Sequence, residues 1–224
     1  MELTTVHLVR HGEVDNPTGI LYGRRPGFHL TELGLAMGEE VGKAFSEGHD
    51  VRYVASSPLE RAQETAAPTA RVAGVDTVID DRLIEAGNKF EGVAVNKNRL
   101  VLAHPRYYSW YANPFEPSWG EPYTNVVRRM SGAIGKALTE ARGGEAVLFS
   151  HQLPIWTMRR FVERKWLAHD PRKRQCALAS VTSLTFADSQ LLALDYWEPA
   201  ADLVAIAADM VPGTSAAAEA KGDE

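Results

Sequence analysis

Apolar and polar positions along the chain follow two alternating patterns. Between short apolar runs, apolar residues recur every three or four positions, which is typical of helices that cover a sheet. One helical face holds Leu33, Met37, Val41 and Phe45, and another holds Val126, Met130, Ala133 and Ala137. The apolar runs, rich in β-branched residues, predict strands at 6–9, 51–55, 77–79 and 146–149. This alternation predicts an α/β three-layer sandwich, with a mainly parallel central sheet flanked by helices.

The last strands are expected to differ from this rhythm. Residues 182–186 and 191–196 are separated only by 187–190, so they predict a hairpin or a pair of edge strands. No internal repeat or linker divides the chain. We therefore expect a single domain over 1–199 and an Ala-rich tail over 200–224, mobile from about 212.

One long stretch, residues 87–123, shows little periodicity and is rich in aromatic residues. Its aromatic side chains are Tyr107, Tyr108, Trp110, Tyr111, Phe115, Trp119 and Tyr123. Irregular segments of this length are commonly lids or binding segments, and the aromatic residues argue against disorder. The segment is predicted to be either an irregular lid over a pocket or a plug that completes the core, and the sequence favours neither.

Composition and charge exclude several classes of protein. The chain has 224 residues, a net charge of −5 and a pI of about 5.8, so no general positive field attracts nucleic acid or an anionic membrane. No apolar stretch reaches the roughly 20 residues of a membrane span. Cys176 is the one cysteine and has no disulfide partner within the chain. A reducing cytoplasm is the expected location; the oligomeric state is left open.

Candidate chemistry gathers at the ends of three predicted strands. Arg10 and His11 follow the first, Arg61 lies shortly after the second, and His151 follows the fourth. The carboxyl ends of parallel strands share one edge of a sheet, where ligands bind in open α/β folds. Two arginines and two histidines are therefore expected to converge there.

Helix-start signals indicate an anion site at the same edge. In Ser57-Pro58-Leu59-Glu60 the serine is predicted to cap a helix, the proline to take its first position and the glutamate to complete a capping box. Pro154 suits the opening of another helix directly after His151. Free backbone N–H groups at such helix starts favour an anionic ligand.

Other reactive residue types have simpler interpretations. His7 lies within the first strand and is expected to pack in the core, and Cys176 is expected to be a small buried residue. His29, His49, His104 and His169 show no metal-ligand spacing, and no metal site is predicted. The run Arg172–Lys173–Arg174 is expected to be a solvated face, with attraction of an anionic substrate as the alternative.

Four segments together resemble the histidine phosphatase superfamily, also called phosphoglycerate mutase-like. They are "VRHGE", which contains the Arg10-His11-Gly12 motif, "SSPLERAQETA", "RLIEAGNKFEG" and "FSHQLP". The resemblance implies that His11 is a nucleophile that takes up a phosphoryl group, surrounded by Arg10, Arg61 and His151. It also implies that Glu85 is the acid that protonates the leaving oxygen. By the same resemblance, substrate contacts fall at Asn16, Tyr22, Gly23 and Gln152.

The chemistry of these residue types agrees with that role. Guanidinium groups bind phosphate oxygens bidentately and can replace a metal ion in holding phosphoryl charge. Neutral imidazole is a competent nucleophile near pH 7, and a carboxylic acid can protonate a poor leaving group. Glu13 and Glu64 rival Glu85 as that acid.

The expected function is a metal-independent phosphatase that hydrolyses a small phosphorylated metabolite through a phosphohistidine, without a cofactor. A mutase of the phosphoglycerate type, with a bisphosphate primer, is the nearest alternative. Two others are a metal-dependent hydrolase with His11, His151 and Glu85 as ligands, and a module that only binds phosphorylated ligands.

Overall fold

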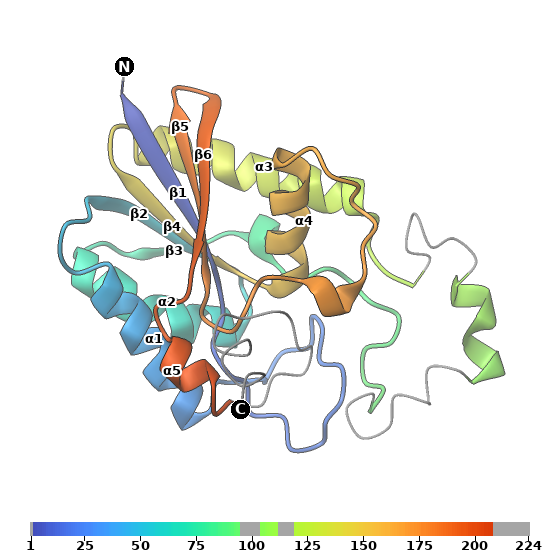
Figure 1. Ribbon diagram of the computed structural model, residues 1–224. Coiled ribbons are helices and arrows are strands. Elements are labelled where there is room, and N and C mark those ends of the chain that lie inside the picture. The colour runs from blue at the N-terminus through green and yellow to red at the C-terminus, as the bar shows by residue number, and fades with distance from the viewer. Residues whose placement is uncertain (1, 95–103, 112–118, 208–224) are drawn as a thin grey trace, which may run out of the picture.

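A six-stranded sheet forms the centre of the molecule. The computed structural model describes residues 2–94, 104–111 and 119–207. The strands lie in the order β3-β2-β4-β1-β5-β6, so β4 and β1 are central (Figure 1). Their bounds are β1 Leu3–Arg10, β2 Val51–Ser56, β3 Thr77–Ile79, β4 Glu145–Ser150, β5 Val181–Ala187 and β6 Gln190–Trp197.

All six predicted strands are confirmed, most of them longer by one to three residues at one or both ends. The pairs β1–β4, β2–β4 and β2–β3 are parallel, whereas β5 pairs antiparallel with both β1 and β6. The sheet is therefore mixed and mostly parallel, with the predicted hairpin at one edge. Because β1, β2 and β4 run in the same direction, their carboxyl ends meet at one edge of the sheet (Figure 1).

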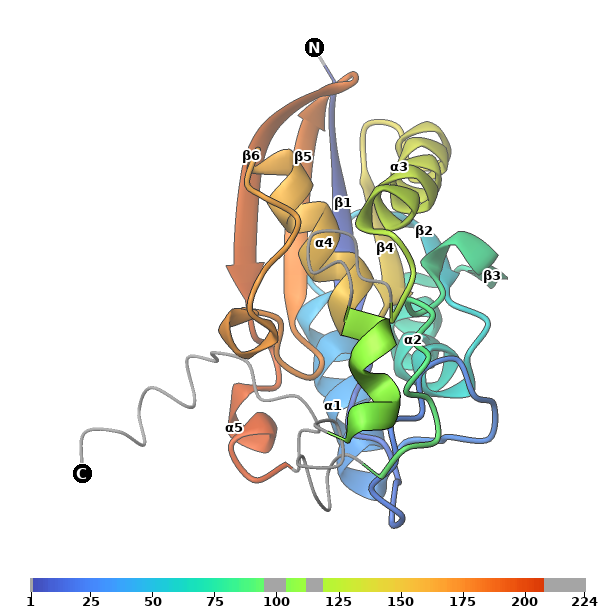
Figure 2. The same cartoon turned by 90° about the vertical axis from the view of Figure 1, so that its right-hand side faces the viewer.

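Helices cover both faces of the sheet, which confirms the three-layer sandwich. Their bounds are α1 Glu32–Ala44, α2 Glu60–Ala73, α3 Tyr123–Glu140, α4 Gln152–Val162 and α5 Ala201–Val204. Side chains of α1, α2 and α5 pack on one face, and those of α3 and α4 pack on the other. In Figure 2, α3 and α4 lie on the viewer's side of the sheet.

Alternation along β1 explains why its apolar residues stand at odd and even positions alike. Val6 and Leu8 belong to the cluster under α3 and α4, whereas Val9 belongs to the cluster under α1 and α2. Successive side chains of a strand point to opposite faces, so a strand covered on both sides needs apolar residues on both faces. A strand packed in this way is rigid, and the residues at its end are held in place.

The aromatic stretch leaves the core beside Glu85 and returns to the same place. Gly120 bridges to Asn88, and the Glu121 N–H donates to the Gly87 carbonyl at 2.9 Å. Between them, Pro105–Tyr111 form a 3-10 helix, and the buried Tyr107 ring packs on Phe90 with ring centroids 5.1 Å apart. Residues 95–103 and 112–118 lie outside the described residues, and the prediction of a lid over 87–123 includes both.

The start of the predicted tail is helical and packed. Leu203 and Val204 of α5, with Ala207, pack against the cluster under α1 and α2. Residues 208–224, which include the segment predicted to be mobile, lie outside the described residues. Among the described helices, none has both the length and the apolar character that crossing a membrane requires.

Candidate active site

The predicted histidines and arginines do converge at the carboxyl edge of the sheet. β4 lies between β1 and β2, and Arg10 at the end of β1 pairs in register with Ser150 at the end of β4. The residues that follow, His11 and His151, therefore come side by side, with ring centroids 5.1 Å apart. Arg61, the second residue of α2, reaches the same point from the end of β2 and donates to His151 Nδ1 at 3.5 Å.

The His11 ring is held in one tautomer. Its Nδ1 lies 2.8 Å from the Gly12 carbonyl oxygen, which can only accept, so Nδ1 carries the proton and Nε2 keeps its lone pair. Burial, and then the charges of Arg61 and Arg10, hold the His11 pKa well below its ordinary value of 6.5. The ring is therefore neutral near pH 7, with a lone pair on the nitrogen turned away from its own backbone.

The turn after His11 depends on the absence of a side chain at Gly12. A Cβ there would lie 2.6 Å from the carbonyl oxygen of Gly34 in the first turns of α1. The Gly12 N–H also donates to the Thr65 hydroxyl of α2 at 3.1 Å. The loop is thus clamped between two helices, which holds the His11 ring against the sheet edge.

Arg61 is a fully buried cation. Its guanidinium donates to the Gly23 carbonyl at 2.7 Å and stacks on the Tyr22 ring, with Cζ 4.7 Å from the ring centroid. Its Nε and Nη1 have no hydrogen-bond partner among the described residues. Burial lowers the pKa of Arg61, and a guanidinium with unsatisfied donors in such a place is suited to a ligand with anionic oxygens.

Ser57 positions His151 and does not cap α2 as predicted. α2 begins at Glu60 with Leu59 at the N-cap and no side-chain cap, because the Ser57 hydroxyl lies 2.8 Å from His151 Nε2. The predicted Ser-Glu capping box is therefore wrong. Glu60 accepts the Gly27 N–H at 3.1 Å instead. Since Arg61 approaches Nδ1, His151 donates from Nε2 to Ser57, and burial followed by the charge of Arg61 lowers its pKa well below 6.5.

Glu85 lies beside these cations after the short 3-10 helix Asp81–Leu83. Its Oε1 accepts the Ala86 N–H at 2.7 Å. Burial raises the pKa of this carboxyl above its ordinary value of 4.5, while the Ala86 hydrogen bond and Arg61 oppose that shift. The raised pKa favours the protonated form of Glu85, which lies beside the arginines that are suited to bind an anion.

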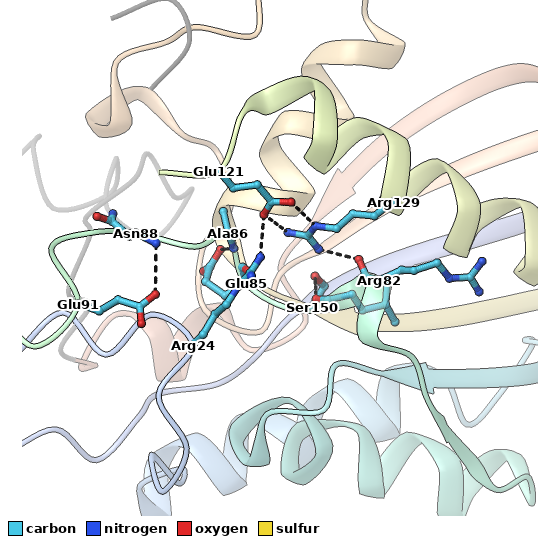
Figure 3. Close-up of polar contacts among 10 residues, drawn as sticks. Arg24, Arg82, Glu85, Ala86, Asn88, Glu91, Glu121, Arg129 and Ser150 are labelled. Atoms are coloured by element: carbon cyan, nitrogen blue, oxygen red, sulfur yellow. Dashed lines mark hydrogen bonds and ion pairs between the residues drawn. The ribbon is translucent and has the colours of Figure 1, made fainter. Parts of the chain in front are cut away.

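A network of charged groups fixes the backbone at Glu85 (Figure 3). Arg24 Nε donates to the Glu85 carbonyl at 2.6 Å and its Nη2 to Glu121 at 2.8 Å, while Arg129 pairs with the same carboxylate at 3.0 Å. Arg129 also donates to the Arg82 carbonyl at 2.6 Å. Glu121 thus links α3, Arg24 and the loop of Glu85, and no local spacing in the sequence signals this link.

Arg10, Gln152 and Arg174 meet around the Cys176 carbonyl. Arg10 Nη1 donates to that oxygen at 2.8 Å and Gln152 Nε2 at 3.4 Å, while Arg174 donates to Gln152 Oε1 at 3.1 Å. Arg174 is therefore not part of a solvated face, in contrast to Arg172 with its 79% exposed side chain. Burial lowers the pKa of Arg174, while the nearby Glu85 carboxyl opposes that shift, so this guanidinium also lies close to Glu85. Cys176 is buried, as predicted.

The other predicted substrate contacts lie on the loop after β1. The Tyr22 ring centroid lies 6.5 Å from that of His11, and Gly23 has a left-handed φ of 47°, where an added Cβ would meet Glu91 at 2.4 Å. Asn16 bonds within its own loop, donating to the Ile20 carbonyl at 2.9 Å and accepting from Thr18. Tyr22 and Gly23 thus lie against Arg61 and His11, whereas Asn16 shapes the loop.

The rival carboxylates have other partners. Glu64 pairs with His29 and accepts the Leu30 N–H at 2.8 Å. Glu13 accepts the Thr31 hydroxyl at 2.5 Å, next to the first turn of α1.

Buried imidazoles around this site predict a loss of stability in mild acid. Burial lowers the pKa of His169 to about 4, from 6.5 in an unfolded chain. Between these values only the unfolded state takes up the proton, so stability falls as the pH falls through that window. Burial also lowers the pKa of His11 and of His151, so these two rings likewise make stability fall as the pH falls. We expect the melting temperature to drop from pH 7.5 to 5.0, and to drop less in His169→Gln. His29→Gln is the control of opposite sign, because the hydrogen bond to Glu64 raises the pKa of His29 and its replacement should not reduce the drop. An unchanged drop in His169→Gln would contradict this assignment.

Comparison with known proteins agrees with the geometry. The sequence pattern of the histidine phosphatase superfamily (branch 1) matches residues 6–198. The uncharacterized protein Rv0525 of Mycobacterium tuberculosis (strain ATCC 25618 / H37Rv) is 50% identical over 200 residues, covering 89% of this chain and 98% of that protein. A 2,3-bisphosphoglycerate-dependent phosphoglycerate mutase of Thermoplasma acidophilum is 42% identical over 101 residues, covering 43% of this chain and 50% of the mutase.

Solved structures share the fold. The mycobacterial glucosyl-3-phosphoglycerate phosphatase Rv2419c superposes with a TM-score of 0.69 at 21% identity, over 88% of this chain and 99% of the other. A phosphoglycerate mutase from Bacillus anthracis superposes with a TM-score of 0.68 at 20% identity, over 91% and 96% of the two chains. A phosphatase and a mutase thus share this architecture.

Proposed function

Because the chain belongs to the histidine phosphatase superfamily (branch 1), we propose that it is a phosphatase that hydrolyses small phosphomonoesters through a phosphohistidine at His11. One observation carries this proposal most directly. The His11 and His151 rings lie 5.1 Å apart, and the buried Arg61 guanidinium beside them keeps two donor atoms, Nε and Nη1, without a partner among the described residues. Two imidazoles and a partly unsatisfied guanidinium are a suitable environment for one tetrahedral oxyanion.

His11 supplies the attacking atom. Its Nε2 lone pair forms a bond to phosphorus as the bond from phosphorus to the ester oxygen breaks. No base is needed, because the lowered pKa already keeps the ring neutral. The Nδ1–H bond to the Gly12 carbonyl holds the ring and stabilises the positive charge that develops on it.

Arg10 and Arg61 hold the charge of the transferring group. A phosphoryl transition state spreads charge over three equatorial oxygens, and preorganised cations stabilise it without reorganisation. His151, neutral while it faces Arg61, gains a favourable partner when a phosphate dianion enters, because the nearby negative charge raises its pKa. These groups supply the charge that a metal ion provides in other phosphoryl-transfer enzymes, so the proposed reaction needs no metal and no cofactor.

Glu85 completes the cycle as acid and then base. Protonated, it gives its proton to the leaving oxygen, so that an alcohol departs instead of an alkoxide. As a carboxylate, it takes a proton from the water that attacks phosphohistidine, which releases inorganic phosphate and restores His11. The link from Arg24 to the Glu85 carbonyl holds this residue in place.

Replacing Glu85 is expected to slow hydrolysis by an amount that depends on the leaving group of the substrate. Glu85→Gln keeps the shape but cannot donate the proton, so hydrolysis of an alkyl phosphate such as glycerol phosphate should fall by about 10²- to 10⁴-fold. p-Nitrophenyl phosphate, whose leaving group needs no proton, should be affected far less in its first step, which single-turnover release of nitrophenol measures. Glu64→Gln is the matched control. Equal losses for the two substrates in that step would remove Glu85 from the acid role.

The reaction itself is tested by two assays run side by side. The purified protein should release inorganic phosphate from p-nitrophenyl phosphate, at an unchanged rate in EDTA. It should interconvert 3- and 2-phosphoglycerate only weakly, even with the bisphosphate primer. Efficient interconversion with little phosphate release would establish the mutase alternative, and a rate abolished by EDTA and restored by a divalent metal would establish a metal-dependent hydrolase. A screen of phosphorylated metabolites would then identify the substrate.

A further inference from the structure

A second group of polar side chains lies on the sheet apart from the phosphate site. His7 Nε2 lies 3.1 Å from Glu145 Oε2, and His49 Nδ1 lies 2.6 Å from the same oxygen. One ligand atom from each of the three residues lies within 4.8 Å of the others. Sequence spacing does not reveal this group, because its members come from β1, the α1–β2 loop and β4.

Strand register brings the three residues together. Thr5 pairs with Glu145 in the parallel β1–β4 ladder, so His7, two residues further along β1, projects from the same face as Glu145. The Glu145 N–H donates to the Asp50 carbonyl at 2.8 Å, which places the neighbouring His49 at the start of β4. The group is therefore fixed by backbone hydrogen bonds of the sheet.

Neighbouring groups orient the His7 ring as they do at metal sites. Its Nδ1 lies 2.8 Å from the Ser183 hydroxyl, which also accepts the Trp197 indole N–H at 3.1 Å. Metal-bound histidines commonly donate their second ring nitrogen to such a partner, which directs the other lone pair at the metal. The Phe45 ring packs edge-on against both imidazoles, with centroids 4.9 and 5.0 Å away, and limits their rotation.

We propose that His7, His49 and Glu145 bind a Zn²⁺ ion that ties β1, β4 and the α1–β2 loop together. Ligands at about 2.0–2.1 Å from a tetrahedral zinc stand about 3.3 Å apart. The carboxylate oxygen lies 3.1 Å from His7 Nε2 and 2.6 Å from His49 Nδ1, so the His49 ring would move outward slightly to admit the ion. The His49 and Glu145 side chains are 27% and 21% exposed, so water can reach the site and supply a fourth ligand.

The ligand set selects the kind of metal. Two imidazoles with one carboxylate suit zinc and its borderline neighbours, whereas Mg²⁺ and Ca²⁺ prefer sites made of oxygen atoms. Glu145 precedes His151 by six residues of β4 and its connection, roughly 20 Å at about 3.3 Å per residue. The zinc site therefore lies outside the phosphate site, and the inference does not depend on the proposed phosphatase activity.

Zinc binding to the full chain tests the inference. Protein without an affinity tag, stripped of metal by a chelator and dialysed, is titrated with ZnCl₂ by isothermal calorimetry, with the melting temperature followed in parallel. We expect one ion per chain, a rise in the melting temperature, and binding weaker by more than about 100-fold in His49→Gln and in Glu145→Gln. His29→Gln, at an exposed histidine that pairs with a single carboxylate, is the matched control and should bind as the wild type does.

Two further measurements keep the test decisive if a variant folds poorly. Co²⁺ added to the wild-type protein should give the intense visible absorption of four-coordinate cobalt, and the rate of p-nitrophenyl phosphate hydrolysis should be the same with and without zinc. Three results would each overturn the proposal. They are no saturable binding to the wild type, undiminished binding in a folded His49→Gln, and binding that inhibits phosphate release, which would place the ion at His11 and His151.

Discussion

Replacing His11 with alanine is expected to abolish turnover while leaving the fold intact. The variant loses the only atom proposed to bond to phosphorus, so kcat should fall by on the order of 10⁴- to 10⁶-fold, as it does when other covalent nucleophiles are removed. Stability should change little, because burial already opposes protonation of this ring and, among the described residues, its side chain bonds only to the carbonyl of its own neighbour, Gly12. Steady-state hydrolysis of p-nitrophenyl phosphate measures the loss.

A trapping experiment identifies the atom involved. Rapid acid-free quenching with labelled substrate should capture an acid-labile, alkali-stable phosphoprotein in the wild type and none in His11→Ala. The phosphoryl group should be on Nε2, because Nδ1 carries the proton donated to the Gly12 carbonyl. His29→Ala is the control and should be labelled normally. Phosphate on another residue, or labelling that survives in His11→Ala, would refute the proposed nucleophile.

Replacing Arg61 should separate activity from stability. In Arg61→Met the cation that contacts His151 and whose charge acts on His11 is lost. Removal of one such charged donor costs about 3–4 kcal/mol of transition-state stabilisation, or about 10²- to 10³-fold in kcat/KM. The melting temperature should not fall. Burial lowers the pKa of this guanidinium, which means that the folded state disfavours its charge, and methionine fills a similar apolar volume without that cost.

The control for Arg61 is Arg71→Met, further along the same helix. Arg71 is a surface residue paired with Glu39, with a side chain 63% exposed, and its replacement should change neither kcat/KM nor stability appreciably. A strong fall in the melting temperature of Arg61→Met with near-normal turnover would show that Arg61 serves the fold and not the phosphate. Arg61→Lys should recover part of the activity, since it restores charge without the planar fork.

The sequence by itself determined the layers, the strands and four of the residues at the site. Val6, Leu8 and Val9 are apolar because both faces of β1 are covered, and this requirement is written locally in the chain. Arg10, His11, Arg61 and His151 could be placed at one edge because parallel strands end together. Glu85 was indicated by the resemblance to the family, because the residues that form such a motif lie close together in the sequence.

Tertiary structure alone decided which partners those residues have. Ser57 reads as a helix cap, yet its hydroxyl faces His151, because the neighbouring strand end offers a buried imidazole nitrogen. Arg174 belongs to a run of basic residues that predicts a solvated face, yet its side chain points inward and donates to Gln152. The sequence around Ser57 or Arg174 cannot show which partner the side chain has. A hydrogen-bond partner far along the chain leaves no periodic pattern in the sequence.

The group of His7, His49 and Glu145 shows the same limit most clearly. The residues stand 42 and 96 positions apart in the chain, which gives no metal-ligand spacing, and only the register between β1 and β4 brings His7 to Glu145. Hydrophobic periodicity records which face of an element is buried. The register of strands, and with it the chemistry that forms between them, is set by the packing of the whole sheet.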